Sequence, residues 1–199
     1  MMLRISDFRT RARSRLPRFV FDYVDGAAED EECIVRNESD LRALHLLPTC
    51  LRDTSQLDTS IEVFGSRWAS PFGITPVGFA GLVRPHGDME LARAAASLGI
   101  PFVLSTPSND RIEAVRASAM NGSQWMQLYV MGDRSIAEQM VRRAKRAGYS
   151  ALVLTVDATV SGMRERDVRN GFKLPFRPGL KTLVDLATHP AWSLSMAIS

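Results

Sequence analysis

The stretch LVLTVDATVSGMRERD, residues 152–167, places an acidic and a basic side chain beyond a buried apolar run. Asp157 stands where the apolar run stops, and Arg164 follows seven residues later. A carboxylate so placed could orient a histidine and stabilise the imidazolium that forms when it takes a proton. A guanidinium matches a substrate carboxylate in bidentate geometry and keeps its charge at any working pH. The ordinary interpretation of Arg164 taken alone is nevertheless a solvated loop charge.

Three earlier apolar runs also end in polar or glycine-containing segments: TPVGFAG from Thr75, LSTPSN from Leu104 and MQLYV from Met126. The backbone of residues 76–78 carries little side-chain bulk, which suits close approach by a flat ligand. The polar side chains at these ends that could bond the edge of a heteroaromatic ring are Ser105, Gln127 and Thr155. Each of them could instead satisfy loop backbone. Because all four runs end this way, we favour a binding site over four separate coincidences.

The four runs, near residues 71–77, 101–106, 125–130 and 151–156, predict strands that position these side chains. None alternates strictly between polar and apolar residues, which is typical of parallel strands covered on both faces. Helical patterns lie between them, with caps expected at Asp88, at Ser108 or Asn109, and at Asp133, and a stop at Gly148. The strands recur at intervals of about 23 to 29 residues, the length of a βα unit.

A doubly wound sheet and a (β/α)8 barrel both remain compatible with four such units. No GxGxxG motif follows the first strand, which argues against a dinucleotide-type Rossmann domain. Before the strands, residues 6–38 predict helices in pieces: one capped by Ser6, one with Pro17 in its first turn, and an acidic helical start after Gly26. Residues 60–71 predict a short hairpin with Gly65-Ser66 at its turn.

The composition bounds the class of protein. The chain has 199 residues, 45% hydrophobic and 24% charged, and a formal net charge of +3, which fits a globular domain with one core. No basic stretch is interleaved with aromatic residues, so we expect no nucleic-acid partner. Cys33 and Cys50 form no CxxC pattern, so we expect neither a disulfide framework nor a metal site, and a reducing cytosol fits. No apolar run is long enough to cross a bilayer, while peripheral membrane contact is left open.

Five blocks together carry a family resemblance: FVFDYVDGAAEDE, PVGFAG, PFVLST, QLYV and LTVDATVSGMRERD. In this order and at these spacings they resemble the FMN-dependent 2-hydroxy-acid dehydrogenases and oxidases, which include L-lactate dehydrogenase, mandelate dehydrogenase and glycolate oxidase. The likeness runs through essentially the whole chain. It implies α/β architecture: the first half, about four βα units, of a TIM (β/α)8 barrel, preceded by N-terminal helices and a hairpin. Residues 1–199 would form one partial domain, divided into a helical segment (1–59), hairpin and strands (60–157) and the start of a long loop (158–199).

The resemblance also implies roles for individual residues. FMN would be approached by the backbone of Pro76, Val77 and Gly78 and bonded at its polar edge by Ser105, Thr155 and Gln127. Tyr23 and Arg164 would hold the carboxylate of a 2-hydroxy acid, Tyr129 would contact the oxygen at the reacting carbon, and Asp157 would orient the histidine base. Arg166 could still be a solvated loop charge.

The chain departs from the family pattern in three respects. Val77 replaces a common threonine, and Pro107 stands where oxidases tend to carry an aromatic residue, which favours the lactate or mandelate dehydrogenase branch. The catalytic histidine block, a flavin-binding lysine, a second carboxylate-binding arginine and the phosphate site of the later strands have no counterpart. The histidines present are His45, His86 and His189, and none matches the family's base. We therefore expect the N-terminal half of such an enzyme.

Three explanations of the missing second half stay open: a partial sequence, a split enzyme whose other half is a separate chain, or a half-barrel that dimerises. The first functional hypothesis is oxidation of an L-2-hydroxy acid to the 2-oxo acid by a cytoplasmic homo-oligomer, with membrane contact at the inner face through the loop after the fourth strand left open. The alternative is a noncatalytic half-barrel interaction protein or one subunit of a split enzyme. Another phosphate-binding barrel enzyme is a third reading, but it leaves RERD and FDYVDGAAED unexplained.

Overall fold

A computed structural model describes residues 1–158 and 160–199. The chain divides into two compact units, and the first combines residues 1–53 with residues 160–199. The second unit comprises residues 54–159. The segment before the expected hairpin and the segment after the last expected strand therefore fold together, and each unit is described by itself.

Unit 1 is helical. Its elements are α1 (Ile5–Arg15), α2 (Arg18–Asp25), α3 (Glu32–Arg42), α8 (Glu165–Arg169), α9 (Leu180–Thr188) and α10 (Pro190–Ala197). The first three were expected, with small shifts in their caps: α1 begins after Arg4, and Asp7 accepts hydrogen bonds from the N–H groups of Leu3 and Arg4. Pro17 is the N-cap of α2 instead of its first residue. The expected long loop from residue 158 contains the last three helices.

Aromatic packing joins the two sequence segments of unit 1. Phe19 is buried on α2, and its ring centroid lies 5.0 Å from that of Phe176 and 5.8 Å from that of Phe172. Trp192 from α10 meets the same ring edge-on at 6.0 Å. Such pairs add about 0.5–1.5 kcal/mol each beyond the burial of their area. The apolar face of α2 thus holds the segment beyond residue 160.

Unit 2 begins with the expected hairpin, in which β1 (Ile61–Val63) pairs with β2 (Ser66–Trp68) in antiparallel register. The turn is one residue earlier than expected, at Phe64 and Gly65, which both have positive φ. A two-residue turn with positive φ at both positions matches the right-handed twist of the flanking strands. Ser66 is therefore the first residue of β2.

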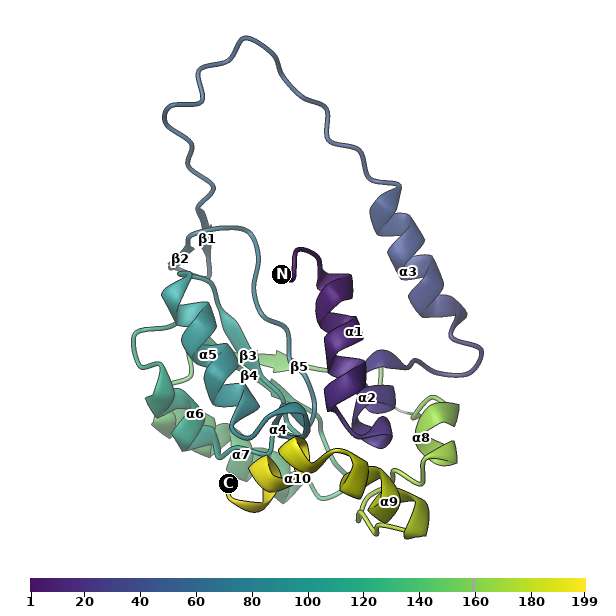
Figure 1. Cartoon of the computed structure of the whole chain (residues 1–199). Coiled ribbons are helices and arrows are strands. Elements are labelled where there is room, and N and C mark those ends of the chain that lie inside the picture. The colour runs from purple at the N-terminus through teal and green to yellow at the C-terminus, as the bar shows by residue number, and fades with distance from the viewer. Residues whose placement is uncertain (159) are drawn as a thin grey trace. The chain divides into compact units, whose positions relative to one another are not determined.

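The core of unit 2 is a parallel sheet of order β3–β4–β5, formed by Phe102–Leu104, Gln124–Leu128 and Ala151–Leu154. The helices between these strands are α6 (Ile112–Ser118) and α7 (Arg134–Ala147), and α4 (Ala80–Val83) and α5 (Gly87–Ser97) precede β3. Helices α5, α6 and α7 lie side by side against one face of the sheet (Figure 1). Their small residues pack with Phe102, Leu104 and Met126, which are almost fully buried.

The first expected strand, near residues 71–77, is reduced to a single bridge between Ile74 and Phe102. Ile74 donates its N–H to the oxygen of Pro101 and accepts from the N–H of Val103, both at 2.9 Å. Pro71 and Pro76 lack an N–H group, and prolines prevent continuation of a ladder. The parallel βα order is nevertheless the expected one.

Candidate functional site

Side chains at the carboxyl ends of β3 and β4 and just after β5 form a polar row of Ser105, Gln127 and Thr155. The register pairs Leu104 with Met126 and Gln127 with Val153. Because side chains alternate along a strand, Ser105, Gln127 and Thr155 therefore lie on the same face of the sheet. Ser105 and Gln127 are buried. The Gln127 side-chain amide donates to the Thr155 hydroxyl at 2.8 Å. The structure thus brings together the three side chains expected at a flavin edge.

Thr106 completes this row and was not identified from the sequence. Its N–H donates to Gln127 Oε1 at 2.9 Å, and its hydroxyl donates to the backbone oxygen of Gln127 at 2.8 Å. The same hydroxyl accepts the N–H of Tyr129 at 3.0 Å. Its position directly after Ser105, in a stretch of hydroxyl residues, was the available signal. Thr106 fixes the Gln127 amide, which leaves one amide hydrogen and the Thr155 hydroxyl hydrogen to face a ligand.

The remaining expected residues of unit 2 lie around the row. Pro76 and Val77 are exposed and Gly78 is half-buried, just before α4, where the N–H of Phe79 donates to the oxygen of Pro107 at 2.9 Å. Tyr129 and Asp157 are exposed beyond the ends of β4 and β5. Within the described residues no hydrogen bond or ion pair of the Asp157 carboxylate is recorded, so this group is accessible to an external partner.

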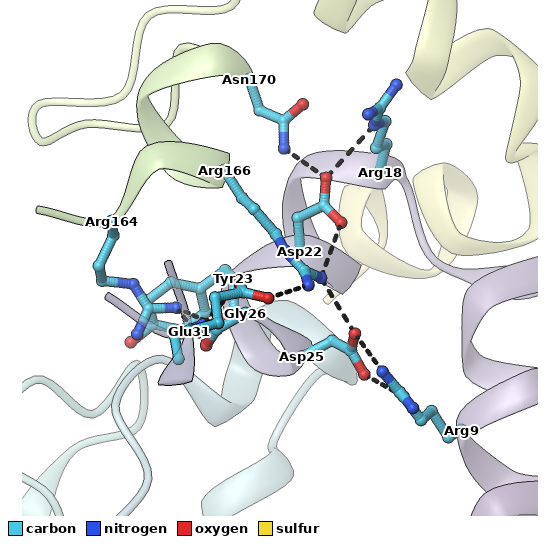
Figure 2. Close-up of polar contacts among 11 residues, drawn as sticks. Arg9, Arg18, Asp22, Tyr23, Asp25, Gly26, Glu31, Arg164, Arg166 and Asn170 are labelled. Atoms are coloured by element: carbon cyan, nitrogen blue, oxygen red, sulfur yellow. Dashed lines mark hydrogen bonds and ion pairs between the residues drawn. The ribbon is translucent and has the colours of Figure 1, made fainter. Parts of the chain in front are cut away.

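Tyr23 and Arg164, the residues expected to hold a substrate carboxylate, meet in unit 1. The Arg164 guanidinium carbon lies 5.1 Å from the centre of the Tyr23 ring. Figure 2 shows that Arg164 turns toward the backbone around Tyr23. Its Nη2 donates to the oxygens of Tyr23 and Gly26, and its Nε donates to Asp167 Oδ2 at 2.6 Å. These contacts hold the guanidinium plane, and in the described part of the chain no acceptor of its Nη1 is recorded.

Arg166 is not the solvated loop charge that the sequence allowed. It is half-buried and contacts three carboxylates of the N-terminal segment, those of Asp22, Asp25 and Glu31 (Figure 2). Arg9 also pairs with Asp25, and this contact, followed by Arg166, holds the pKa of Asp25 below its usual range. Arg166 therefore acts within unit 1 as a structural cation.

A second polar cluster, beside α5, involves the one histidine close to a strand-end loop. His86 Nδ1 lies 3.0 Å from Asp110 Oδ1. Ser108 donates its hydroxyl hydrogen to Asp88 Oδ2 at 2.6 Å. Burial raises the pKa of Asp88, with Asp110 adding to the effect and the Ser108 hydrogen bond opposing it. These contacts tie the start of α5 to the loop that carries Ser105 and Pro107.

The donor set of the row fits the polar edge of a flavin. A buried amide with a fixed orientation and two hydroxyl-bearing neighbours stand on one sheet face, at the ends of parallel strands where ligands bind in βα folds. Residues 76–78 supply backbone groups on the adjacent segment. Residues 76–78 carry no aromatic or charged side chain, so a planar ring can approach their backbone.

Comparison with known proteins decides the family. The model of the FMN-dependent dehydrogenase family matches residues 12–198. The chain belongs to this family of FMN-dependent 2-hydroxy-acid dehydrogenases. It is 44% identical over 193 residues to (S)-mandelate dehydrogenase of Pseudomonas putida, covering 97% of this chain and 49% of that protein. It is 42% identical to L-lactate dehydrogenase of Ectopseudomonas mendocina, covering 97% of this chain and 50% of that protein.

Solved structures of this FMN family agree. A crystal structure of the monotopic membrane protein (S)-mandelate dehydrogenase matches with a TM-score of 0.91 at 42% identity, covering 99% of this chain and 52% of that one. Mandelate oxidase with (S)-4-hydroxymandelic acid matches with a TM-score of 0.82 at 37% identity, covering 87% of this chain and 48% of that one. The chain thus spans about half the length of the relatives it matches, in agreement with the expectation of an N-terminal half.

Proposed function

We propose that this chain supplies the flavin-edge and substrate-carboxylate contacts of an enzyme that oxidises an L-2-hydroxy acid, lactate-like or mandelate-like, to the 2-oxo acid. The observation that carries the proposal is the Gln127 amide, fixed by Thr106 and joined to Thr155 at the strand ends. FMN, when bound, accepts the two electrons of the oxidation. Gln127, Ser105 and Thr155 would bond its polar edge, and residues 76–78 would approach it through their backbone.

The other expected residues would act on the substrate. Arg164 would present its remaining Nη1 to the substrate carboxylate, with the Tyr23 ring beneath the guanidinium. This charge would select acids over neutral alcohols. Tyr129 would donate its hydroxyl to the oxygen at the reacting carbon. Asp157 would orient the histidine that takes the proton and would stabilise the resulting imidazolium.

Complementation tests this function. The chain is co-expressed with the C-terminal half of Pseudomonas putida (S)-mandelate dehydrogenase, and the purified assembly is assayed for flavin absorbance and for oxidation of L-lactate and (S)-mandelate with an artificial electron acceptor. We expect bound FMN and turnover of one of the acids. An assembly that forms but neither binds FMN nor oxidises any 2-hydroxy acid would refute the proposal.

Two arginine variants separate substrate binding from folding in that assembly. Arg164→Met removes a charge-assisted contact worth about 1.5–3 kcal/mol, so kcat/KM should fall roughly tenfold or more. Arg169→Met removes an exposed cation of the same segment and should leave kcat/KM unchanged. Equal effects of the two substitutions would contradict the assignment of Arg164.

A noncatalytic role remains the second candidate because no strand among the described residues pairs with the outer edge of β5, which exposes Leu152 and Leu154. An open strand edge and apolar side chains are typical of association surfaces. In this case the chain would bind a partner without acting on a substrate. Purification of a stable, colourless heteromer that gains no flavin would favour this role over catalysis.

Peripheral membrane contact through residues 158–199 is the last part of the proposal. Leu180, Leu183 and Val184 are exposed at helical spacing on α9, a pattern typical of helices that lie in a membrane interface. The related mandelate dehydrogenase is a monotopic membrane protein. Within the described residues no helix combines the length and apolar character needed to span a bilayer. We also predict that the complete enzyme forms a homo-oligomer.

A further inference from the structure

The turn that follows β3, residues 105–108, carries part of the polar row. The N–H of Ser108 donates to the backbone oxygen of Ser105 at 3.2 Å and closes the turn. Between these two residues, Thr106 holds the side-chain amide of Gln127 through its own N–H. The position of Ser108 therefore affects the orientation of the amide on which the proposed function depends.

The same turn also contacts the backbone segment that we expect to approach the flavin. The oxygen of Pro107 accepts the N–H of Phe79, which directly follows residues 76–78, at 2.9 Å. Phe79 has a φ of 55°, an unfavourable value for a residue with a side chain, and such values persist where surrounding contacts fix them. A Cβ on Gly81 would lie 2.6 Å from the Cβ of Asn109, so the two backbones pack closely. Both parts of the proposed flavin site thus depend on this turn.

A buried carboxylate holds the turn from the side of α5. Asp88 is 1% exposed, and its Oδ2 accepts the Ser108 hydroxyl hydrogen at 2.6 Å. Within the described residues this is the one hydrogen bond recorded for the Asp88 side chain. Desolvation of a carboxylate is costly, and an apolar residue of similar size is often as stable or more stable at such a position. Packing alone therefore gives no reason for Asp88, whereas fixing the turn does.

A second contact joins the same two segments closer to the surface. His86 Nδ1 lies 3.0 Å from Asp110 Oδ1, and the His86 side chain is 56% exposed. An ion pair at such an exposed position contributes little. The N–H of Asp110 donates to the Ser108 Oγ at 3.0 Å, so this oxygen accepts one hydrogen bond while its hydrogen is donated to Asp88. The contact between Asp88 and Ser108 is thus the buried one of the two.

We propose that Asp88 and Ser108 are positioning residues of the flavin site, whose hydrogen bond holds the turn at residues 105–108 so that Thr106 keeps the Gln127 amide directed at the flavin edge. The inference rests on the proposed function and adds to it the contacts that orient the row. The connection runs from α5 through the Ser108 hydroxyl and the Thr106 N–H to Gln127. Neither Asp88 nor Ser108 is itself assigned a contact with the flavin. Loss of their hydrogen bond should therefore weaken FMN binding by disordering the groups that make the contact.

Two measurements test this proposal. Amide hydrogen exchange of the full chain reports on the turn without a flavin, through the N–H groups of Thr106 and Tyr129 relative to those of α7. Ser108→Ala and Asp88→Ala should each accelerate exchange at these two groups about tenfold. The second measurement is FMN affinity, from quenching of flavin fluorescence, in the assembly with the C-terminal half of Pseudomonas putida (S)-mandelate dehydrogenase. The same variants should weaken FMN affinity about tenfold.

Conservative variants and a matched serine separate positioning from general stability. Asp88→Asn keeps an oxygen for the Ser108 hydroxyl, and Ser108→Thr keeps the hydroxyl, so both should retain the wild-type exchange and affinity. Ser118→Ala removes another half-buried hydroxyl that contacts α5, at the oxygen of Met89 and outside the turn. This control should change neither measurement.

Each other outcome contradicts a different statement. If Ser108→Ala alters exchange no more than Ser118→Ala does, other contacts hold the turn and the inference is wrong, independently of any flavin. If exchange accelerates but FMN affinity stays at the wild-type value, the turn does not position the flavin site, while the proposed function stands. A wild-type assembly that binds no FMN would contradict the proposed function itself, and the assignment of positioning residues with it.

Discussion

At the scale of single residues, Arg164 and Arg166 show how two neighbouring cations acquire different tasks. Arg166 faces three carboxylates, so its charge is neutralised within the fold. Arg164 has one carboxylate partner, Asp167, and two backbone oxygens. Arg164 thus has fewer carboxylate contacts than Arg166 within the described residues, which supports the proposal that it binds the substrate carboxylate. The spacing in RERD could not reveal this difference, because the partners come from residues more than a hundred positions earlier.

Arg166 should therefore matter for stability more than other arginines of unit 1. Arg166→Met leaves three carboxylates facing each other, and we expect a loss of about 1–2 kcal/mol, reduced from the value for a fully buried group by solvent screening. Arg169→Met, which removes an exposed i,i+4 partner of Glu165, should cost under about 0.5 kcal/mol. Urea denaturation of both variants measures the two values. Equal midpoints would contradict the structural role of Arg166.

Asp88 should make stability fall as the pH rises. Its pKa is raised above its usual value of 3.8 in the folded state, mainly by burial. Below pH 3.8 Asp88 is protonated in both the folded and the unfolded protein, and its contribution to stability is fully present. Above that pH Asp88 ionises first in the unfolded protein. Its contribution to stability is therefore lost as the pH rises through the pKa of the folded state. Asp88→Asn should remove this decline, which thermal unfolding between about pH 3 and pH 7 measures.

Asp133 serves as a control for Asp88, because its pKa is shifted in the opposite direction. The Ser135 side chain and N–H lower the pKa of Asp133, so its contribution is present above pH 3.8 and is lost as the pH falls through the folded pKa. Asp133→Asn should therefore lose stability at neutral pH. Parallel pH profiles for Asp88→Asn and the wild type would contradict the inference about Asp88.

At the scale of elements, local signals predicted the existence of helices better than their first residues or the strands. The caps expected at Asp88 and at Ser108 or Asn109 were wrong, because α5 and α6 begin after His86 and Arg111. Asp133 caps α7 by accepting the Ser135 N–H, and Gly148 ends it with φ of 91°, as the sequence indicated. Both signals act within a few residues of the helix end. The expected strand at residues 71–77 depended instead on pairing with β3, and its prolines limit that pairing to one bridge. Pairing partners are not visible in a local pattern.

The contact between α6 and α7 should contribute stability that acid removes. Arg143 holds Glu113 in a two-point contact and, as the main cause, lowers the pKa of Glu113 from 4.5 to about 2. The contribution is present above pH 4.5 and is lost as the pH falls toward 2. Both side chains are largely exposed, so Glu113→Gln should cost only about 0.5–1 kcal/mol.

The measurement is denaturant unfolding at about pH 7 and pH 3. Glu138→Gln is the matched control, because Glu138 forms a more exposed pair with Arg142 within α7 alone and no comparable loss is expected. A Glu113→Gln effect that is as large at pH 3 as at pH 7 would show that the ion pair is not its cause.

At the scale of the whole molecule, the outer edge of β5 is a surface suited to association with another chain. Within the described residues β5 pairs only with β4, and Leu152 and Leu154 are 46% and 51% exposed on one face of it. Natural sheets usually cover or charge such edges, because an open edge pairs with other chains. A further element paired with β5 would therefore bury Leu152 and Leu154.

The isolated chain should self-associate through this edge. Leu154→Lys places a charge on the edge strand and should shift sedimentation-velocity profiles toward the monomer at high concentration. Leu98→Lys introduces the same charge at an exposed leucine at the end of α5 and should leave association unchanged. Wild-type chain that stays monomeric at all concentrations would contradict this prediction.

The sequence by itself determined the family, the order of βα units, the caps of α7 and the identity of most residues of the row, because these depend on patterns within short segments or on whole-chain similarity. Only the tertiary structure decided that Thr106 fixes Gln127, that Arg166 is neutralised by the N-terminal segment, and that Asp88 is buried against Ser108. These facts depend on which distant segments share a surface. A side chain's partners and burial are set by packing between segments, and packing is not encoded in any one stretch.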